Sequence, residues 1–193
     1  MPKIQGRSAQ RARTRQAILD GARKLLSEGK TVTVAAAAAE NGVSKATSYR
    51  YFSDADLLVA EAVLDITTKP YEAVVSGATD LRSKLKAICL YYLDLAFEHE
   101  PEFRQFLAAS MRAWTAESKG ATRGGRRVSM FHRALSEHET GLSDDQRETL
   151  VCGLSASTGM EALIALIDVA GATPDQARDV VGFMVEAMLD RAL

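Results

Sequence analysis

The sequence has few of the residues on which disulfide-stabilised and metal-binding proteins depend. Its only two cysteines, Cys89 and Cys152, lie in apolar helical patterns, and we expect both to be buried free thiols. The three histidines have no metal-type spacing among themselves and no cysteine nearby, so we expect no metal site. The longest run without a charged residue, 149–160, has 12 residues, well under the roughly 20 that span a bilayer. We therefore expect no membrane partner either.

The common motifs of catalysis are also missing. The sequence contains no glycine-rich phosphate loop, no nucleophile elbow and no His-Glu-x-x-His motif. Glu161 and Asp168 are seven residues apart and have no evident acid or base partner. The charged N-terminus has no apolar segment after it, so we predict no signal peptide and a cytoplasmic location. An enzyme stays a remote alternative, and we expect no cofactor.

Proline is scarce as well, at four residues in 193, and its scarcity favours helices. Apolar residues make up 47% of the chain and recur at helical intervals. No stretch alternates as a half-buried strand would. The pattern therefore predicts an all-α fold of about nine helices.

Residues 33–52 have the pattern of two short helices joined by a tight turn. Thr33 can cap the first helix, in which alanine predominates. Gly42 suits a left-handed turn, because glycine has no side chain to clash in that conformation. Ser44 can cap a second helix over 45–51. Two helices joined in this way form a helix-turn-helix, whose second helix enters the major groove of DNA.

One face of the second helix has side chains that suit DNA. Ser48 and Phe52 are four residues apart, so we expect them to share the face that turns inward. The opposite side presents groups that neutralise phosphates, reach base edges or donate to phosphate oxygens. These are Lys45, Thr47, Tyr49, Arg50 and Tyr51. A surface helix that merely carries charge and aromatic rings is the alternative interpretation.

Over about residues 10–60 the sequence resembles the N-terminal domain of TetR-type transcriptional regulators. A first helix, the turn and a following amphipathic helix occur in the order and spacing of that family. The residues that carry the resemblance are Thr14, Arg15, Ile18, Leu19, Ala22, Leu25, Leu26, Gly29, Thr33, Val34, Ala38, Gly42, Val43, Ser44, Lys45, Thr47, Tyr49, Tyr51, Phe52, Leu57 and Leu58.

The resemblance implies a three-helix DNA-binding domain at 8–54, with its helix-turn-helix at about 33–52, and a larger helical domain for effector binding and dimerisation at 55–193. It implies a repressor that binds a palindromic operator in double-stranded DNA as a homodimer and is released by a small effector. The predicted DNA-binding residues are Thr33, Ser44, Lys45, Thr47, Tyr49, Arg50, Tyr51 and Arg15. The alternative is an activator or a DNA-architectural protein of the same fold that needs no ligand.

Three residues depart from the pattern of the family. Ala37 replaces a larger aliphatic residue and Ser48 replaces a leucine, so both predict a smaller core beneath the second helix. Ala55 stands where a lysine commonly meets phosphate, which removes one predicted anchor.

Charge is distributed unevenly along the chain, although the formal net charge is only −1. Residues 1–52 contain ten basic and three acidic residues, a net +7, and the remainder carries −8. A basic head on an acidic body favours a polyanionic partner, because an ordinary solvated surface mixes both signs.

Two helices near the C-terminus are the predicted dimer interface. A capping-box spacing at Ser143 and Gln146 opens a long helix over about 143–170, and a second helix covers about 174–192. Small residues in the first allow close approach of another helix, and the second has an apolar stripe. The predicted contacts are Gly153, Gly159, Ala162, Val181, Met184 and Met188. Tight packing within one chain is the alternative.

The larger domain also has aromatic and sulfur-containing residues that could hold a flat apolar effector. The candidates are Cys89, Tyr92, Phe106, Met111, Trp114, Phe131, His132 and Ser157. Residues of this kind at helical spacing are more often core than binding site, and packing is therefore the alternative.

Overall fold

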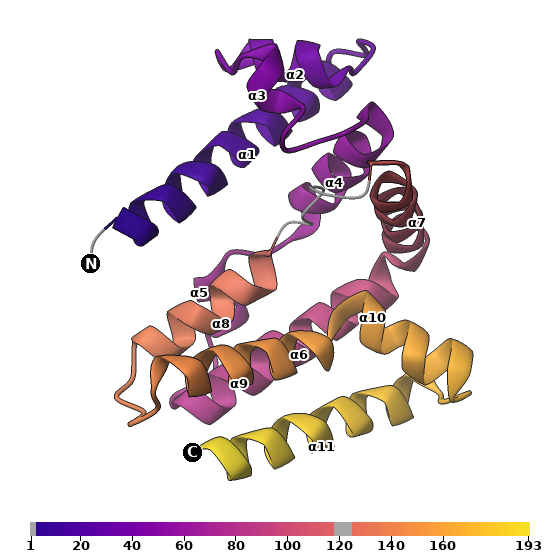
Figure 1. Cartoon of the computed structure of the whole chain (residues 1–193). Helices are drawn as coiled ribbons and strands as arrows, with labels where there is room; N and C mark the ends of the chain where they lie inside the picture. The colour runs from indigo at the N-terminus through magenta and orange to yellow at the C-terminus, as the bar shows by residue number, and fades with distance from the viewer. Residues whose placement is uncertain (1–2, 118–124) are drawn as a thin grey trace. The chain divides into compact units, whose positions relative to one another are not determined.

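The computed structural model describes residues 3–117 and 125–193, without the side chains of residues 3–9, 64–67, 113, 116 and 117. Every regular element in this part of the chain is a helix (Figure 1). The predicted all-α fold is thus confirmed. The described residues form eleven α-helices and one π-helical segment rather than about nine helices. Short helices at connections and one interrupted long helix account for the difference.

The chain divides into two compact units. The first combines Met1–Thr68 with Pro101–Gly124, and the second combines Lys69–Glu100 with Gly125–Leu193. The first unit therefore contains more than the predicted segment 8–54.

The first unit surrounds one hydrophobic core. Its helices are α1 (Lys3–Ser27), α2 (Val34–Glu40), α3 (Lys45–Ser48), α4 (Ala55–Thr67) and α7 (Glu100–Glu117), of which α7 enters the unit at Pro101. The buried core residues are Ile18, Leu19, Ala22, Leu25, Val34, Ala37, Ala38, Phe52, Leu57, Leu58, Ala62 and Ala109. Since α1 contributes four of them and contacts both α2 and α4, it is the central helix of the unit.

Residues with short polar side chains begin the helices of this unit. Asp54 caps α4 by accepting a hydrogen bond of 2.8 Å from the Leu57 amide, which would otherwise have no partner in the first helical turn. Ala55 is the first residue of that helix and contributes no cation there.

The second unit is built around α6 (Leu81–Glu98), which touches α5, α8, α10 and α11. These are α5 (Tyr71–Val74), α8 (Arg126–Ser136), α10 (Gly159–Leu163) and α11 (Pro174–Ala192), with α9 (Asp144–Ala156) and the π-helical segment η1 (Ile164–Val169) completing the unit. Capping boxes open α6, α9 and α11, and the sequence predicts the one at α9.

The predicted long helix over 143–170 is interrupted. It separates into α9 and the α10–η1 segment, which are bent by 55° relative to each other. Gly159 follows the break with φ +75°, and the Thr158 hydroxyl donates to the Cys89 carbonyl of α6. Arg127 donates to the Thr158 carbonyl over 3.3 Å. The interruption is therefore stabilised by hydrogen bonds from α6 and α8. Such contacts cannot be predicted from the helix propensity of residues 143–170 alone.

The two cysteines differ from each other. Cys89 is buried, as predicted, and burial raises the pKa of its thiol to about 12. Cys152 is exposed, so the prediction of a buried thiol is wrong for this residue, which lies on the outer side of α9.

Within the described residues, no single helix is long and apolar enough to cross a membrane. The bent pair formed by α9 and the α10–η1 segment passes that test by length and composition.

Candidate nucleic-acid interface

The turn between α2 and α3 has the geometry that its sequence predicts. The Thr33 hydroxyl accepts a hydrogen bond from the Ala36 amide over 3.1 Å and caps α2. Gly42 has φ +69°, in the left-handed region that glycine occupies without strain. The Ser44 hydroxyl then accepts from the Thr47 amide over 3.3 Å and caps α3. Both predicted caps and the predicted turn are therefore confirmed.

Two polar contacts fasten α2 and its turn to α1. The Asn41 side chain donates to the Ala17 carbonyl over 2.7 Å. Lys24 lies 2.5 Å from the Glu40 carboxylate, and its hydrogen bond to that carboxylate raises the pKa of Lys24. The turn is therefore attached to the longest helix of the unit at two points.

The two helices also approach closely where both residues are small. A side chain at Gly21 on α1 would overlap the Ala37 carbonyl on α2. Ala37 was predicted to leave the core small, and it is fully buried where α1 and α2 meet. The short distance between the two helices leaves no room for a side chain at Gly21.

The inner face of α3 is closed, as predicted. Ser48 and Phe52 are both fully buried, and the Ser48 hydroxyl donates to the Lys45 carbonyl over 2.8 Å. This bond satisfies the buried hydroxyl of Ser48. Val43 and Tyr51 pack against the same core from its edge.

The α-helical part of this segment is shorter than expected. Regular α-helix ends at Ser48, and residues 49–51 continue as a turn. The amides of Tyr51 and Phe52 both donate to the Ser48 carbonyl, over 2.9 and 3.1 Å. We call residues 44–52 the recognition segment from here on.

The outer face of the recognition segment is accessible. Ser44, Lys45, Tyr49 and Arg50 are exposed, and so is Thr33 at the start of α2. Thr47 and Tyr51 are half-buried, and the Thr47 hydroxyl accepts a hydrogen bond of 2.9 Å from Ser44. Seven of the eight predicted DNA-binding residues are therefore exposed or half-buried.

The basic residues of the first unit differ in their charge pairing. Four of them pair with nearby carboxylates, namely Arg15 with Glu61, Arg23 with Asp20, Lys24 with Glu40 and Lys30 with Glu28. Among the described residues, Lys45 and Arg50 have no ion-pair partner. Their positive charges are available to an anion from outside the chain.

Arg15 does not fit the predicted DNA-binding set. It forms a bidentate ion pair with Glu61 of α4, and its guanidinium lies 4.4 Å from the centre of the Phe52 ring. It also donates to the Tyr51 carbonyl over 3.3 Å. Arg15 therefore acts inside the unit, because all of its donor nitrogens point at internal partners. Sequence spacing alone could not show this, since Glu61 lies 46 residues away along the chain.

The predicted effector residues of the second unit mostly belong to its interior. Cys89, Tyr92 and Phe131 are buried on α6 and α8. His132 is exposed and lies 3.6 Å from a glutamate, while the Ser157 hydroxyl donates to the backbone carbonyl four residues earlier. These side chains form core or surface contacts, as the packing alternative expects.

The other three predicted effector residues lie on α7 in the first unit. Phe106 packs against the core of that unit, whereas Met111 and Trp114 are exposed, Trp114 with 64% of its surface accessible. Two grooves occur within single units. One of about 440 Å³ runs along α4 and α7, and one of about 710 Å³ runs between α9 and α11. None of the eight predicted residues lines either groove.

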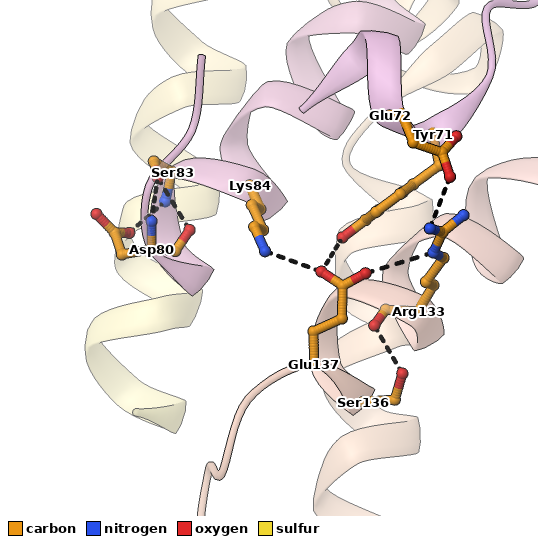
Figure 2. Close-up of polar contacts among 8 residues, drawn as sticks. All are labelled: Tyr71, Glu72, Asp80, Ser83, Lys84, Arg133, Ser136 and Glu137. Carbon is orange, nitrogen blue, oxygen red and sulfur yellow. Dashed lines mark hydrogen bonds and ion pairs between the residues drawn. The ribbon is translucent and has the colours of Figure 1, made fainter. Parts of the chain in front are cut away.

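Glu137 is the centre of a polar cluster in the second unit, and sequence patterns gave no sign of it (Figure 2). Its carboxylate accepts hydrogen bonds of 2.8 Å from both Tyr71 and Lys84, and Arg133 lies 3.4 Å from its other oxygen. These contacts lower the pKa of Glu137. Arg133 also pairs with Glu72 over 2.7 Å and covers the Tyr71 ring. The cluster joins α5 to α6 and α8, and both carboxylate oxygens are already occupied.

Several predicted dimer contacts turn out to be internal. Ala162 and Val181 are buried within their own chain, and a side chain at Gly159 would collide with Arg127. A side chain at Gly153 would lie 2.9 Å from the sulfur of Met188 in the same chain. These four residues therefore make contacts within one chain, and their part in a dimer interface stays a prediction.

Part of the apolar surface of α11 is exposed. Phe183 exposes 75% of its surface and Val180 is also exposed, while Met184 and Met188 are half-buried. Ala177, Val181, Val185 and Leu189 form the buried face of α11. Val180 and Phe183 lie on the exposed side of the same helix, which we call its outward face.

No group of three or more His, Cys, Asp or Glu side chains in the described residues could hold a metal ion. Comparison of the chain with protein-family models, with curated proteins and with solved structures returns no match.

Proposed function

We propose that the protein is a sequence-specific DNA-binding transcriptional regulator that acts as a homodimer. The observation that carries the proposal is the recognition segment itself, a capped helix-turn-helix with a sealed inner face and two unpaired cations outside. Its outer face combines a hydroxyl, an ammonium, a phenol and a guanidinium, which are groups that bind phosphates and base edges.

The charge distribution supports the same proposal. The N-terminal 52 residues carry +7 and the remainder −8, so a polyanion would attract one end of the sequence and be repelled by the other. The resemblance to TetR-type regulators agrees with this arrangement. Regulation by repression, and release by a small apolar effector, stay predictions from that resemblance.

The test begins with selection of bound sequences from a random pool of DNA duplexes by the full chain. A regulator enriches one palindromic motif, because a two-fold symmetric dimer meets two related half-sites. A pool that remains random after selection would instead support an architectural protein that binds any sequence.

Two substitutions then locate the interface. Lys45→Ala and Tyr49→Ala should each weaken binding to the selected site by about 1–3 kcal/mol while leaving the dimer intact. If Lys45 contacts a phosphate, Lys45→Ala should also make the slope of log binding constant against log salt concentration shallower by about 0.9. Tyr49→Ala should leave this slope unchanged, because tyrosine is uncharged. Lys69→Ala, an exposed lysine in the second unit, is the matched control. Equal affinities of all three variants would place the interface elsewhere.

A further inference from the structure

The C-terminal end of the recognition segment contacts a buried ion pair between α1 and α4. The Arg15 Nε atom of α1 lies 2.9 Å from one oxygen of Glu61 on α4, and a terminal nitrogen of Arg15 contacts the other oxygen. The second terminal nitrogen donates to the Tyr51 carbonyl over 3.3 Å. The face of the same guanidinium covers the ring of Phe52, at 4.4 Å from its centre. One side chain thus touches the last two residues of the recognition segment.

The pair is removed from solvent. Only 15% of the Arg15 side chain and 3% of the Glu61 side chain are accessible. Withdrawing two charges from water is costly, and a buried ion pair contributes little more to stability than an apolar pair of similar size. Stability alone therefore gives a weak reason for this arrangement.

An apolar pair could not bind the Tyr51 carbonyl. Carbonyl groups at the end of a helix have no partner within the helix, and here the α-helix already ends at Ser48. Arg15 donates to the Tyr51 carbonyl through one terminal nitrogen. Because the guanidinium is planar, its other two nitrogens can both bind the carboxylate of Glu61. Glu61 therefore determines how the guanidinium is turned toward the recognition segment.

We propose that Glu61 is a positioning residue for DNA recognition, which sets the orientation of the recognition segment through Arg15. The proposal rests on the proposed function. It assigns Arg15 a role different from the phosphate contact that the sequence suggests. It also makes α4 a determinant of sequence preference without any contact between Glu61 and DNA.

The decisive variant replaces both charges with apolar residues of similar size, Arg15→Met with Glu61→Leu. This pair should fold with a thermal midpoint near that of the wild type, because neither charge is left buried alone. Affinity for the selected site should fall at least about tenfold, the effect of losing a hydrogen bond to a charged group. Affinity for random DNA and its salt dependence should stay unchanged. Glu61→Gln, which retains the shape of the side chain, should show the same loss of preference to a smaller extent.

Three results would overturn the proposal. Full sequence preference in the double variant would show that the pair serves only the fold. If Arg15→Met made the slope of log binding constant against log salt concentration shallower by about 0.9, and Glu61→Gln left DNA affinity unchanged, Arg15 would be shown to contact a phosphate. Unchanged amide exchange at residues 50–52 in the double variant would show that the pair does not hold the recognition segment.

Amide exchange also separates this proposal from the proposed function, because it needs no DNA. Faster exchange at residues 50–52, with an unchanged thermal midpoint, would support positioning by the ion pair. Random selection by the wild type together with faster exchange would refute DNA-sequence recognition and leave the structural role of the pair in place.

Discussion

Gly21 sets the distance between α1 and α2. It lies in the interior of α1, where glycine costs about 1 kcal/mol of helix stability relative to alanine. A side chain at this position would meet the Ala37 carbonyl, which belongs to the backbone and has no rotamer to change. The close contact therefore accounts for a residue that is unfavourable by local propensity.

Gly21→Ala should destabilise the protein, although alanine is the better helix former. We expect a loss of about 1–3 kcal/mol in the free energy of unfolding, measured by chemical denaturation, because α1 and α2 must move apart. Gly77→Ala is the matched control, since nothing lies within 4 Å of a side chain added there. Equal stability of the two variants would contradict the close contact.

Tyr71 gives the second unit a predictable response to alkaline pH. Burial, followed by the hydrogen bond with Glu137, raises the pKa of Tyr71 to about 12 from an ordinary value of 10. The contribution of the neutral phenol is therefore complete below about pH 10 and is lost as the pH rises toward 12. Tyr71→Phe cannot ionise, so its deficit in unfolding free energy relative to the wild type should shrink over this interval. The unfolding free energies of both proteins would be measured by chemical denaturation between pH 10 and 12. A difference that stays constant over this interval would contradict the expectation.

Residue roles were predictable from the sequence only where they depended on near neighbours. Thr33 and Ser44 cap the helices that directly follow them, and each was identified correctly. Arg15 has its partner 46 positions away, and nothing in its own surroundings indicates a buried carboxylate. The same is true of Glu137, whose contacts come from three helices.

The interruption between α9 and α10 is the main correction at the scale of whole elements. The sequence from 143 to 170 has helical periodicity throughout, and its two glycines, Gly153 and Gly159, do not by themselves predict a break. The break is stabilised by the contact of Thr158 with α6 and by Arg127 of α8. The capping box of α9, by contrast, was predictable, because both of its residues lie within one helical turn.

Gly159→Ala should therefore affect folding and reveal little about association. Forcing alanine into the left-handed region costs roughly 1–2 kcal/mol, and the new side chain would also displace Arg127. We expect a lower unfolding free energy in chemical denaturation. Gly153→Ala is the control, because the nearest atom is the flexible end of Met188 and the helix gains propensity. An equal or larger loss for the control would contradict this account of the break.

At the scale of the whole molecule, the outward face of α11 is the best candidate for the contact between two copies. Phe183 and Val180 expose apolar surface there, and Ala187 and Met188 of the same helix line the groove between α9 and α11. Large exposed apolar side chains near one another typically mark an interaction surface.

Phe183→Glu should weaken self-association by more than about tenfold, because a buried aromatic anchor often dominates an interface. Sedimentation across a range of protein concentrations would measure the change. Thr79→Glu, an exposed position in the connection between α5 and α6 of the same unit, controls for added charge. A wild type that sediments as a monomer, or a variant that associates as tightly, would contradict an interface on α11.

The contrast between the two cysteines gives the molecule a built-in attachment point for a spectroscopic probe. Thiol-reactive reagents need an accessible thiolate, and Cys89 is both buried and hard to ionise. Cys152 is exposed on α9, so a fluorophore should attach there alone in the folded protein without any cysteine being added or removed. Energy transfer between two labelled copies would then report directly on their separation.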